Sequence, residues 1–407
     1  MTTPRPLQSS GFLILSACLL LTLSFGYRSG FGLFVPPITE ANGWSREVIS
    51  LSLAIQNLVW GIVAVFAGGL ADRFGNVRVI VAGAALYSGG MWLMAGVDSP
   101  WLLHSSAGLM VGAGIAGTAF GIVLPAMARA VPEERRQWAL GVGTAAGSLG
   151  QFLVVPVAQS LIDAFGWIAA LQVLSVTALA MALLAMPLAP YSGAGDNQGA
   201  GAQQSIREAL GEALRHPSFL LLVGGFYVCG FQVAFVTAHM PAFLQDAGFD
   251  PRVGAWAVAI IGLCNVAGAF LSGILSGRFP KRWVLVVIYA VRALAVSAFM
   301  LIPMTLTSVL VFSAVLGLFW LATIPPTSGL VAVMFGTRYM ALLYGVVFLS
   351  HQVGSFCGVW LGGVLYAQTG SYDLVWWLGA LLALAAALVH LPIREEAVPR
   401  LQLARSV

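Results

Sequence analysis

The sequence predicts an all-α membrane protein with twelve transmembrane helices in two pseudo-symmetric six-helix bundles. Three observations support this prediction. The 407 residues are 59% hydrophobic and only 8% charged, whereas soluble domains carry about 25% charged residues. Apolar runs of about 20 residues, the length that crosses a bilayer, recur with short connections between them. The second half of the chain also repeats features of the first half at an offset of about 204 residues.

Each expected span is an apolar run of bilayer-crossing length that ends at a short polar connection. The first run is too long for a cleavable signal peptide, so we expect it to stay as the first helix. The expected spans cover residues 11–37, 46–72, 78–98, 101–128, 137–163, 167–189, 217–245, 253–277, 283–304, 308–334, 339–368 and 373–392.

Residues 191–216 separate the first six expected spans from the last six. We therefore expect one domain at 1–190 and a second domain at 217–407. This connection opens with SGAGDNQGAGAQQ, a linker rich in glycine, serine and glutamine. The following SIREALGEALRHP predicts a short amphipathic helix on the cytoplasmic side. Ser205 stands at the N-cap position of this helix, with Glu208 three residues later.

The arginine and lysine residues predict the orientation in the membrane. With both termini in the cytoplasm, fifteen basic residues fall in cytoplasmic segments, and the outer loops hold only Arg46 and Arg252. This bias follows the positive-inside rule. We therefore expect a multi-pass monomer in a bacterial inner membrane, with the lipid bilayer as its surroundings.

Short motifs carry the internal repeat. The segment Gly26-Tyr27-Arg28 aligns with Gly230-Phe231-Gln232, and Asp72-Arg73-Phe74-Gly75 aligns with Gly277-Arg278-Phe279-Pro280. Both halves run in the same direction. Parallel repeats of this kind build transporters whose halves rock around a central site near the bilayer midplane.

The segment GGLADRFGNVR at residues 68–78 resembles the loop between helices 2 and 3 of the major facilitator superfamily. The resemblance covers essentially the whole chain, and it implies a gating role for this loop. Asp72 would lock the cytoplasmic side closed in one state, whereas Gly277 replaces it in the second half, where the latch should be weaker. The matching gating-loop residues are Gly68, Asp72, Arg73, Gly75 and Arg78.

Within that superfamily the chain is most similar to the monocarboxylate and oxalate/formate transporters. The similar segments are YRSGFGLFVPPI with GWSR, CGFQVAFVTAHMPAFL and SHQVGSFCGVWLGGVLYAQTGSYD. The chain departs from that branch in helix 8, where Asn265 and Ala269 replace an arginine and its frequent acidic partner. It also departs from drug/proton antiporters, which usually carry an arginine early in helix 4, where this chain has His104.

Two arginines lie inside apolar spans, where a charge facing lipid costs about 2.5–3.5 kcal/mol. No aspartate or glutamate lies at mid-span. Arg28 lies near mid-depth on the first helix and is expected to contact a substrate anion, with a structural role as the alternative. Arg292 lies on the peripheral ninth helix, where a structural role and a second anion contact both stay open.

His351 and His239 are the titratable groups at depth, and both are candidates for proton coupling because histidine changes charge near neutral pH. Each could equally serve as a neutral hydrogen-bonding group. The other expected substrate-binding residues are polar or aromatic side chains at depth. They are Tyr27, Phe31, Gln56, Asn57, Gln232, Phe235, Asn265, Trp320 and Gln352.

The sequence therefore predicts a secondary transporter of a small organic anion, with a carboxylate as the expected substrate. Proton-coupled symport and anion exchange stay open, and the alternative is an exporter of hydrophobic or amphipathic compounds. We expect no enzyme, because no catalytic set lies at depth, and no nucleic-acid partner. No cofactor or metal is expected, because the four cysteines lack metal-ligand spacing.

Overall fold

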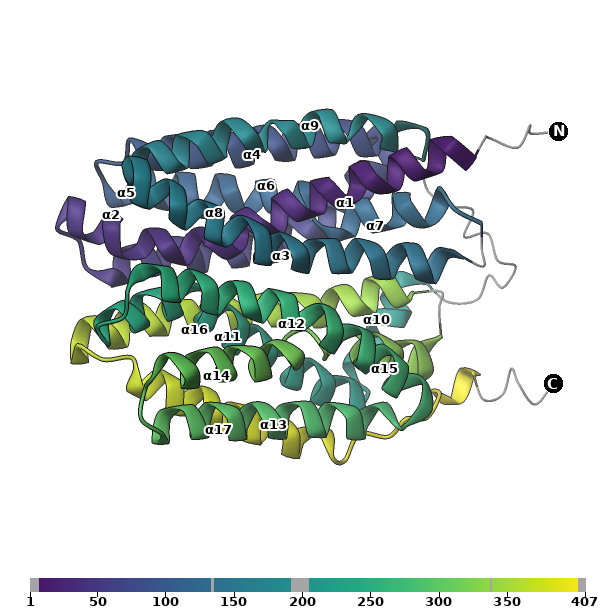
Figure 1. Ribbon diagram of the computed structural model, residues 1–407. Coiled ribbons are helices and arrows are strands. Elements are labelled where there is room, and N and C mark those ends of the chain that lie inside the picture. The colour runs from purple at the N-terminus through teal and green to yellow at the C-terminus, as the bar shows by residue number, and fades with distance from the viewer. Residues whose placement is uncertain (1–6, 133–134, 192–204, 337–338, 402–407) are drawn as a thin grey trace.

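The computed structural model describes residues 7–132, 135–191, 205–336 and 339–401. The regular structure of these residues is helical, without strands, and forms two bundles that lie side by side (Figure 1). This confirms the expected fold class. We call the end of the bundles at which α1 begins the terminal end, and the opposite end, where α2 lies, the distal end (Figure 1).

The first bundle contains six membrane-crossing segments, several of which are built from more than one helix. Its elements are α1 (Leu7–Gly30), η1 (Phe31–Phe34), α2 (Val35–Asn42), α3 (Arg46–Phe74), α4 (Asn76–Ala95), α5 (Pro100–Leu103), η2 (His104–Met110), α6 (Val111–Thr118), α7 (Phe120–Arg129), α8 (Arg136–Ala178), α9 (Ala180–Leu184) and η4 (Met186–Tyr191).

The second bundle follows the short helix α10. Its elements are α10 (Ile206–Leu214), α11 (Pro217–Asp246), α12 (Pro251–Arg278), α13 (Lys281–Leu301), α14 (Leu306–Leu318), α15 (Ile324–Phe335), α16 (Met340–Thr369) and α17 (Asp373–His390).

Ten helical segments of the described chain are long and apolar enough to cross a membrane. One of them, Trp138–Leu184, is 47 residues long and is bent at Gly166, whose φ of 80° and ψ of 164° are not helical. It therefore holds two expected spans, 137–163 and 167–189. The short apolar helices α14 and α15 together fill the expected span 308–334, which accounts for the twelve crossings.

The expected span 308–334 is not one continuous helix. Residues 319–323 interrupt it, and α15 begins with prolines in its first turn. Proline lacks the backbone N–H that continues a helix, and its ring clashes with the preceding turn. The fourth span of the first bundle is interrupted as well, at Ala119, whose ψ of −176° is extended.

Matching side-chain contacts lie beside these two interruptions. The hydroxyl oxygens of Ser24 and Thr118 lie 2.9 Å apart, and Cys229 Sγ lies 3.3 Å from Thr323 Oγ1. Both members of the second pair follow those of the first by 205 positions. The internal repeat of the sequence is thus a repeat of three-dimensional contacts.

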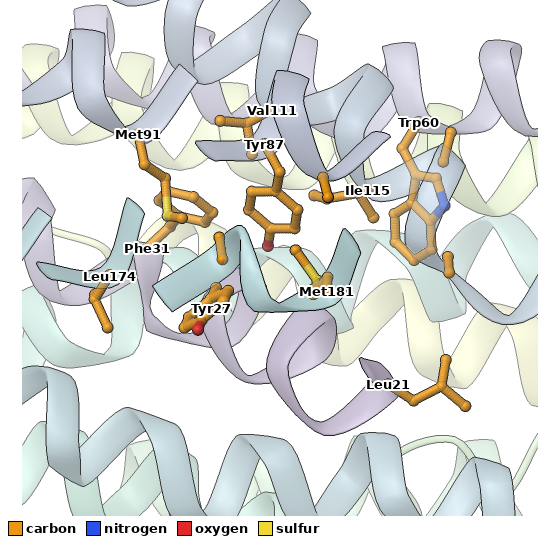
Figure 2. Packing of buried hydrophobic residues seen from close by; sticks show 14 of the residues in the cluster. Leu21, Tyr27, Phe31, Trp60, Tyr87, Met91, Val111, Ile115, Leu174 and Met181 are labelled. Carbon is orange, nitrogen blue, oxygen red and sulfur yellow. The ribbon is translucent and has the colours of Figure 1, made fainter. Parts of the chain in front are cut away.

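Aromatic side chains fill the first bundle near the end of α1. Figure 2 shows Tyr27, Phe31 and Tyr87 together in this core. The ring centroids of Tyr27 and Tyr87 are 6.0 Å apart, and those of Phe31 and Tyr87 are 6.4 Å apart. Tyr87 also donates a hydrogen bond of 3.0 Å to the carbonyl of Ser24, which ties α4 to α1.

The two bundles meet along α3 with α16, α8 with α12, and η1 with α11. The contact of η1 with α11 depends on Gly32. A Cβ atom at Gly32 would lie 2.9 Å from the carbonyl oxygen of Ala238, closer than side-chain carbons normally approach. Glycine therefore allows the two backbones to touch near the distal end.

The short helix expected before the second bundle is present as α10. The backbone N–H of Ser205 donates to Glu208 Oε2 at 2.7 Å, and the N–H of Glu208 donates to Ser205 Oγ at 3.3 Å. The hydrogen bond from the Ser205 backbone lowers the pKa of Glu208. Residues 192–204 of the expected linker lie outside the described residues, so the domain boundaries stay a prediction.

The expected gating loop joins α3 to α4. Gly75 ends α3 with a φ of 91° and donates a hydrogen bond of 2.9 Å to the carbonyl of Ala71. Arg73 and Arg78 are exposed, and Gly68 faces open space. The side chain of Asp72 lies outside the described residues, so its gating role stays a prediction.

Candidate functional site

A small pocket lies between the two bundles. Its volume is about 20 Å³, which holds about one water molecule. The first bundle contributes a charged residue, two amides and an apolar wall, and the second bundle contributes mainly small or apolar residues. The lining residues are Arg28, Phe31, Gly32, Leu53, Gln56, Asn57, Ala234, Thr237, Ala238 and Val359.

Arg28 provides the positive charge of this pocket. It lies in the last turn of α1, directly before the tighter helix η1. Its Nη2 donates to Asn57 Oδ1 at 3.1 Å, and its Cζ lies 4.9 Å from the ring centroid of Trp60. Its Nε is buried without a hydrogen-bond partner. None of the ion pairs formed by the described residues includes Arg28, so a partly buried guanidinium borders the pocket without a counterion among these residues.

A hydrogen-bonded path leads from Arg28 into the second bundle. Gln352 Nε2 donates to the carbonyl of Asn57 at 3.2 Å, and His351 Nδ1 lies 2.9 Å from Gln352 Oε1. Because an amide oxygen only accepts, the histidine nitrogen is the donor in this arrangement. The path therefore connects the arginine of one bundle to a titratable ring of the other.

Aromatic rings follow the same path. Trp60, below the Arg28 guanidinium, packs edge-on against Phe348 with centroids 5.4 Å apart, and Phe348 stacks on His351 at 5.9 Å. The expected site did not include Trp60. This residue lies in an apolar run, where sequence alone cannot distinguish a ring at the bundle interface from one that faces lipid.

The glutamine beside Asn57 is held by the first bundle. Gln56 lines the pocket, and its Nε2 donates to the carbonyl of Ala107 at 2.9 Å. Of the expected substrate-binding residues, Arg28, Phe31, Gln56 and Asn57 therefore share the pocket.

His239 lies outside this pocket and is fully buried. Its Nε2 lies 2.9 Å from the carbonyl oxygen of Val359, and its Nδ1 lies 3.2 Å from Tyr372 Oη. The carbonyl only accepts, so Nε2 carries a hydrogen and Nδ1 accepts from the tyrosine. Both ring nitrogens are thus satisfied when the ring is neutral.

Arg292 is also directed away from the pocket and is only 1% exposed. Its Nε donates to the carbonyl of Phe319 at 2.9 Å, and its Nη2 donates to the carbonyl of Trp320. These carbonyls belong to the interruption between α14 and α15, where helical partners are missing. Its Nη1 lies 3.4 Å from Gln232 Oε1.

The remaining expected polar residues have partners elsewhere. Gln232 donates to the carbonyl of Gly379 at 3.0 Å, inside the second bundle. Asn265 bridges the bundles, because its Nδ2 donates to Ser148 Oγ at 2.8 Å. Tyr27 donates to Thr177 Oγ1 at 3.0 Å in the first bundle.

Two of the expected aromatic residues belong to the core of the second bundle. The ring of Phe235 lies 5.0 Å from that of Trp376, and Trp320 is 3% exposed. Neither lines the pocket between the bundles.

Two ion pairs join the bundles at the distal end. Arg46 binds Asp246 at 2.5 Å, and Arg252 binds Asp163 at 2.8 Å. The expected site did not include these residues. The available signal was that Arg46 and Arg252 are the only basic residues of the expected outer loops.

Comparison with known proteins agrees with this architecture. A profile of the Major Facilitator Superfamily matches residues 17–354 and 240–406. The uncharacterized MFS-type transporter YcxA of Bacillus subtilis (strain 168) is 25% identical over 362 residues, covering 86% of each chain. Monocarboxylate transporter 13 of Rattus norvegicus is 26% identical over 388 residues, covering 93% of this chain and 88% of that protein.

Among solved structures, the inward-facing, occupied form of a bacterial homolog to the human lysosomal transporter Spinster superposes with a TM-score of 0.72. The two sequences are 16% identical, and the superposition covers 95% of this chain and 95% of that protein. The profile spans most of the sequence, and the helical architecture agrees with it. The chain therefore belongs to the Major Facilitator Superfamily of membrane transporters.

Proposed function

We propose that this transporter carries a small organic anion, with a carboxylate as its substrate class. The observation that carries the proposal is the Arg28 guanidinium, which borders the pocket between the bundles and has no acidic partner among the described residues. A charge inside a membrane protein is expensive unless it has a function or a partner. A carboxylate would supply the missing negative charge and would reach the free Nε.

The wall opposite Arg28 fits an anion with an apolar body. Ala234, Ala238 and Val359 of the second bundle face the arginine across the pocket. Small-molecule sites are typically apolar with a few placed polar groups. The similarity to a relative named monocarboxylate transporter 13 supports the same substrate class.

The volume of about 20 Å³ is too small for an organic anion, so the bundles must separate around the pocket before the substrate binds. We propose that they rock about this point in alternating access. With the termini in the cytoplasm of a bacterial cell, the ion pairs of Arg46 and Arg252 close the outer side of the inner membrane.

Proton coupling, where it occurs, is proposed for His351 rather than His239. His351 reaches Arg28 through Gln352 and Asn57, so a change in its charge is transmitted to the anion site. His239 already uses both nitrogens within its own bundle. Anion exchange without a proton is the alternative form of the same function.

A thermal-shift screen of the purified protein tests the substrate class. The panel contains carboxylates, inorganic anions and hydrophobic cations. A ligand at about 100 times its Kd stabilises the folded protein by about 2.7 kcal/mol. We expect stabilisation by a carboxylate that is lost in Arg28→Gln and largely kept in Arg28→Lys, which retains the charge.

The exposed Arg207→Gln variant is the matched control, because it removes an arginine outside the pocket. It should respond to the carboxylate like the wild type. Stabilisation by hydrophobic cations alone, unchanged in Arg28→Gln, would overturn the proposal in favour of an exporter of hydrophobic compounds.

A further inference from the structure

A second and larger cavity lies at the terminal end of the second bundle. It has a volume of about 420 Å³ and is formed by residues 276–282 and 394–396. The first segment connects α12 to α13, and the second follows α17. Four basic side chains line it: Arg278, Lys281, Arg282 and Arg394.

The two glutamates of the cavity, Glu395 and Glu396, offset only part of this charge. Glu395 Oε1 accepts a hydrogen bond of 2.7 Å from the backbone N–H of Arg282, in the first turn of α13. The Arg282 side chain donates to the carbonyl of Ile393 at 3.2 Å. None of the ion pairs formed by the described residues includes Arg278, Lys281 or Arg394. The cavity therefore has an excess of positive charge, and none of the ion pairs of the described residues neutralises it.

Apolar side chains begin directly beside the cavity. Phe279 is 58% exposed and Trp283 is 48% exposed. From there, exposed apolar residues continue along both helices at helical spacing, with Ile274 and Phe270 on α12 and Val287 on α13. Tryptophan is typical of the boundary between headgroups and acyl chains. A ligand in the cavity would thus meet basic groups at one end and an apolar, bilayer-facing surface at the other.

We propose that this cavity binds the phosphodiester headgroup of an anionic glycerophospholipid, with the acyl chains lying along α12 and α13. Arg278, Lys281 and Arg394 contact the phosphate, and Trp283 and Phe279 contact the glycerol and upper acyl region. The ligand is a lipid rather than free phosphate, because only a lipid uses both the basic cavity and the apolar surface. Basic pockets at the cytoplasmic ends of transmembrane helices suit such headgroups.

The test measures lipid binding to the purified full-length protein in a neutral detergent, by native mass spectrometry and by thermal shift. The probes are dioleoyl phosphatidylglycerol, dioleoyl phosphatidylcholine and inorganic phosphate. We expect phosphatidylglycerol to bind and to raise the unfolding temperature. Phosphatidylcholine with the same acyl chains and inorganic phosphate should have little effect.

Arg278→Gln/Arg394→Gln should weaken phosphatidylglycerol binding about 25-fold, about fivefold for each arginine. Both residues are exposed, so the unfolding temperature without lipid should equal that of the wild type. The matched control is Arg207→Gln/Arg215→Gln, which removes two exposed arginines outside the cavity. It should bind the lipid like the wild type.

Glu396→Gln gives a test in the opposite direction, because it removes a negative charge from the cavity and should tighten binding. Equal binding of both lipids would overturn the proposal, and so would equal stabilisation by inorganic phosphate. It would also be overturned if the Arg278→Gln/Arg394→Gln variant bound normally, or if that variant misfolded and Glu396→Gln showed no gain.

Discussion

Arg46 and Asp246 are 200 positions apart and form a two-pronged ion pair across the two bundles, with Nη1–Oδ2 at 2.5 Å and Nη2–Oδ1 at 2.6 Å. The Arg46 Cζ also lies 4.1 Å from the ring centroid of Tyr366, and Nη1 donates to Tyr372 Oη at 3.2 Å. The start of α3 is therefore held by Asp246, Tyr366 and Tyr372 of the second bundle. These contacts must break before the distal ends of the two bundles separate.

Asp246→Asn should shift the protein toward a state with the distal end open, because Arg46 loses its charged partner. A partly exposed ion pair contributes up to about 1 kcal/mol, so the ratio of the two states should change by about threefold to fivefold. Spin labels at Ala41→Cys and Ala247→Cys, in a background without the four native cysteines, report the separation. Asp250→Asn is the control, because Asp250 accepts from the Arg252 backbone in its own bundle. An unchanged distribution of the distance between the two labels would argue that the Arg46–Asp246 ion pair does not hold the distal end closed.

Gly32→Ala should open the same end by a steric route. The new methyl group would clash with the carbonyl oxygen of Thr237 and would lie 2.9 Å from that of Ala238, which forces η1 away from α11. Gly30→Ala is the matched control two residues earlier, where the nearest atom to the new methyl group is 3.8 Å away. The same pair of spin labels should show a wider distal end for Gly32→Ala alone. Identical distances in both variants would contradict this account of Gly32.

Arg292→Gln should reduce stability without abolishing anion binding. The substitution leaves the part-buried carbonyl of Phe319 and the buried carbonyl of Trp320 without the Arg292 donors, and an unsatisfied buried group costs about 1–3 kcal/mol. We expect a lower unfolding temperature in detergent, with the stabilisation by carboxylate retained. A stable variant that no longer responds to the carboxylate would instead identify Arg292 as a second anion ligand.

His351→Gln should remove the pH dependence of transport, whereas His239→Gln should keep it. Histidine gains its charge as the pH falls through about 8 to 5. Proton-coupled uptake should therefore rise over this range in the wild type and stay flat in His351→Gln. Initial rates in proteoliposomes with a fixed internal pH measure this. Loss of the pH dependence in His239→Gln alone would move the coupling to the other ring, and a flat wild-type profile would favour anion exchange.

Several features of the fold follow directly from local sequence. The apolar runs predict the spans because an unpaired backbone group in a bilayer costs several kcal/mol, so a run of bilayer length must be helical. The capping box of α10 depends on two residues three positions apart, Ser205 and Glu208. The interruption over 319–323 was not expected, although Pro325 and Pro326 mark its end in the sequence.

The candidate site was only partly predictable. Arg28, Gln56 and Asn57 line one pocket, because a charge or amide within a span must avoid lipid; their role in binding substrate stays a prediction. Gln232 repeats the position of Arg28 along the chain, yet its amide contacts Arg292 and Gly379 rather than the pocket. The repeat therefore does not predict the partners of a residue.

The sequence by itself determined the number of spans, the internal repeat and the presence of two arginines inside apolar spans, because hydrophobicity and chain length act locally. Only the tertiary structure decided which arginine borders the pocket between the bundles and which one holds an interrupted helix. That outcome depends on how each helix is rotated and packed against neighbours far away in sequence. The Arg46–Asp246 pair and the path from Arg28 to His351 exist only after this packing.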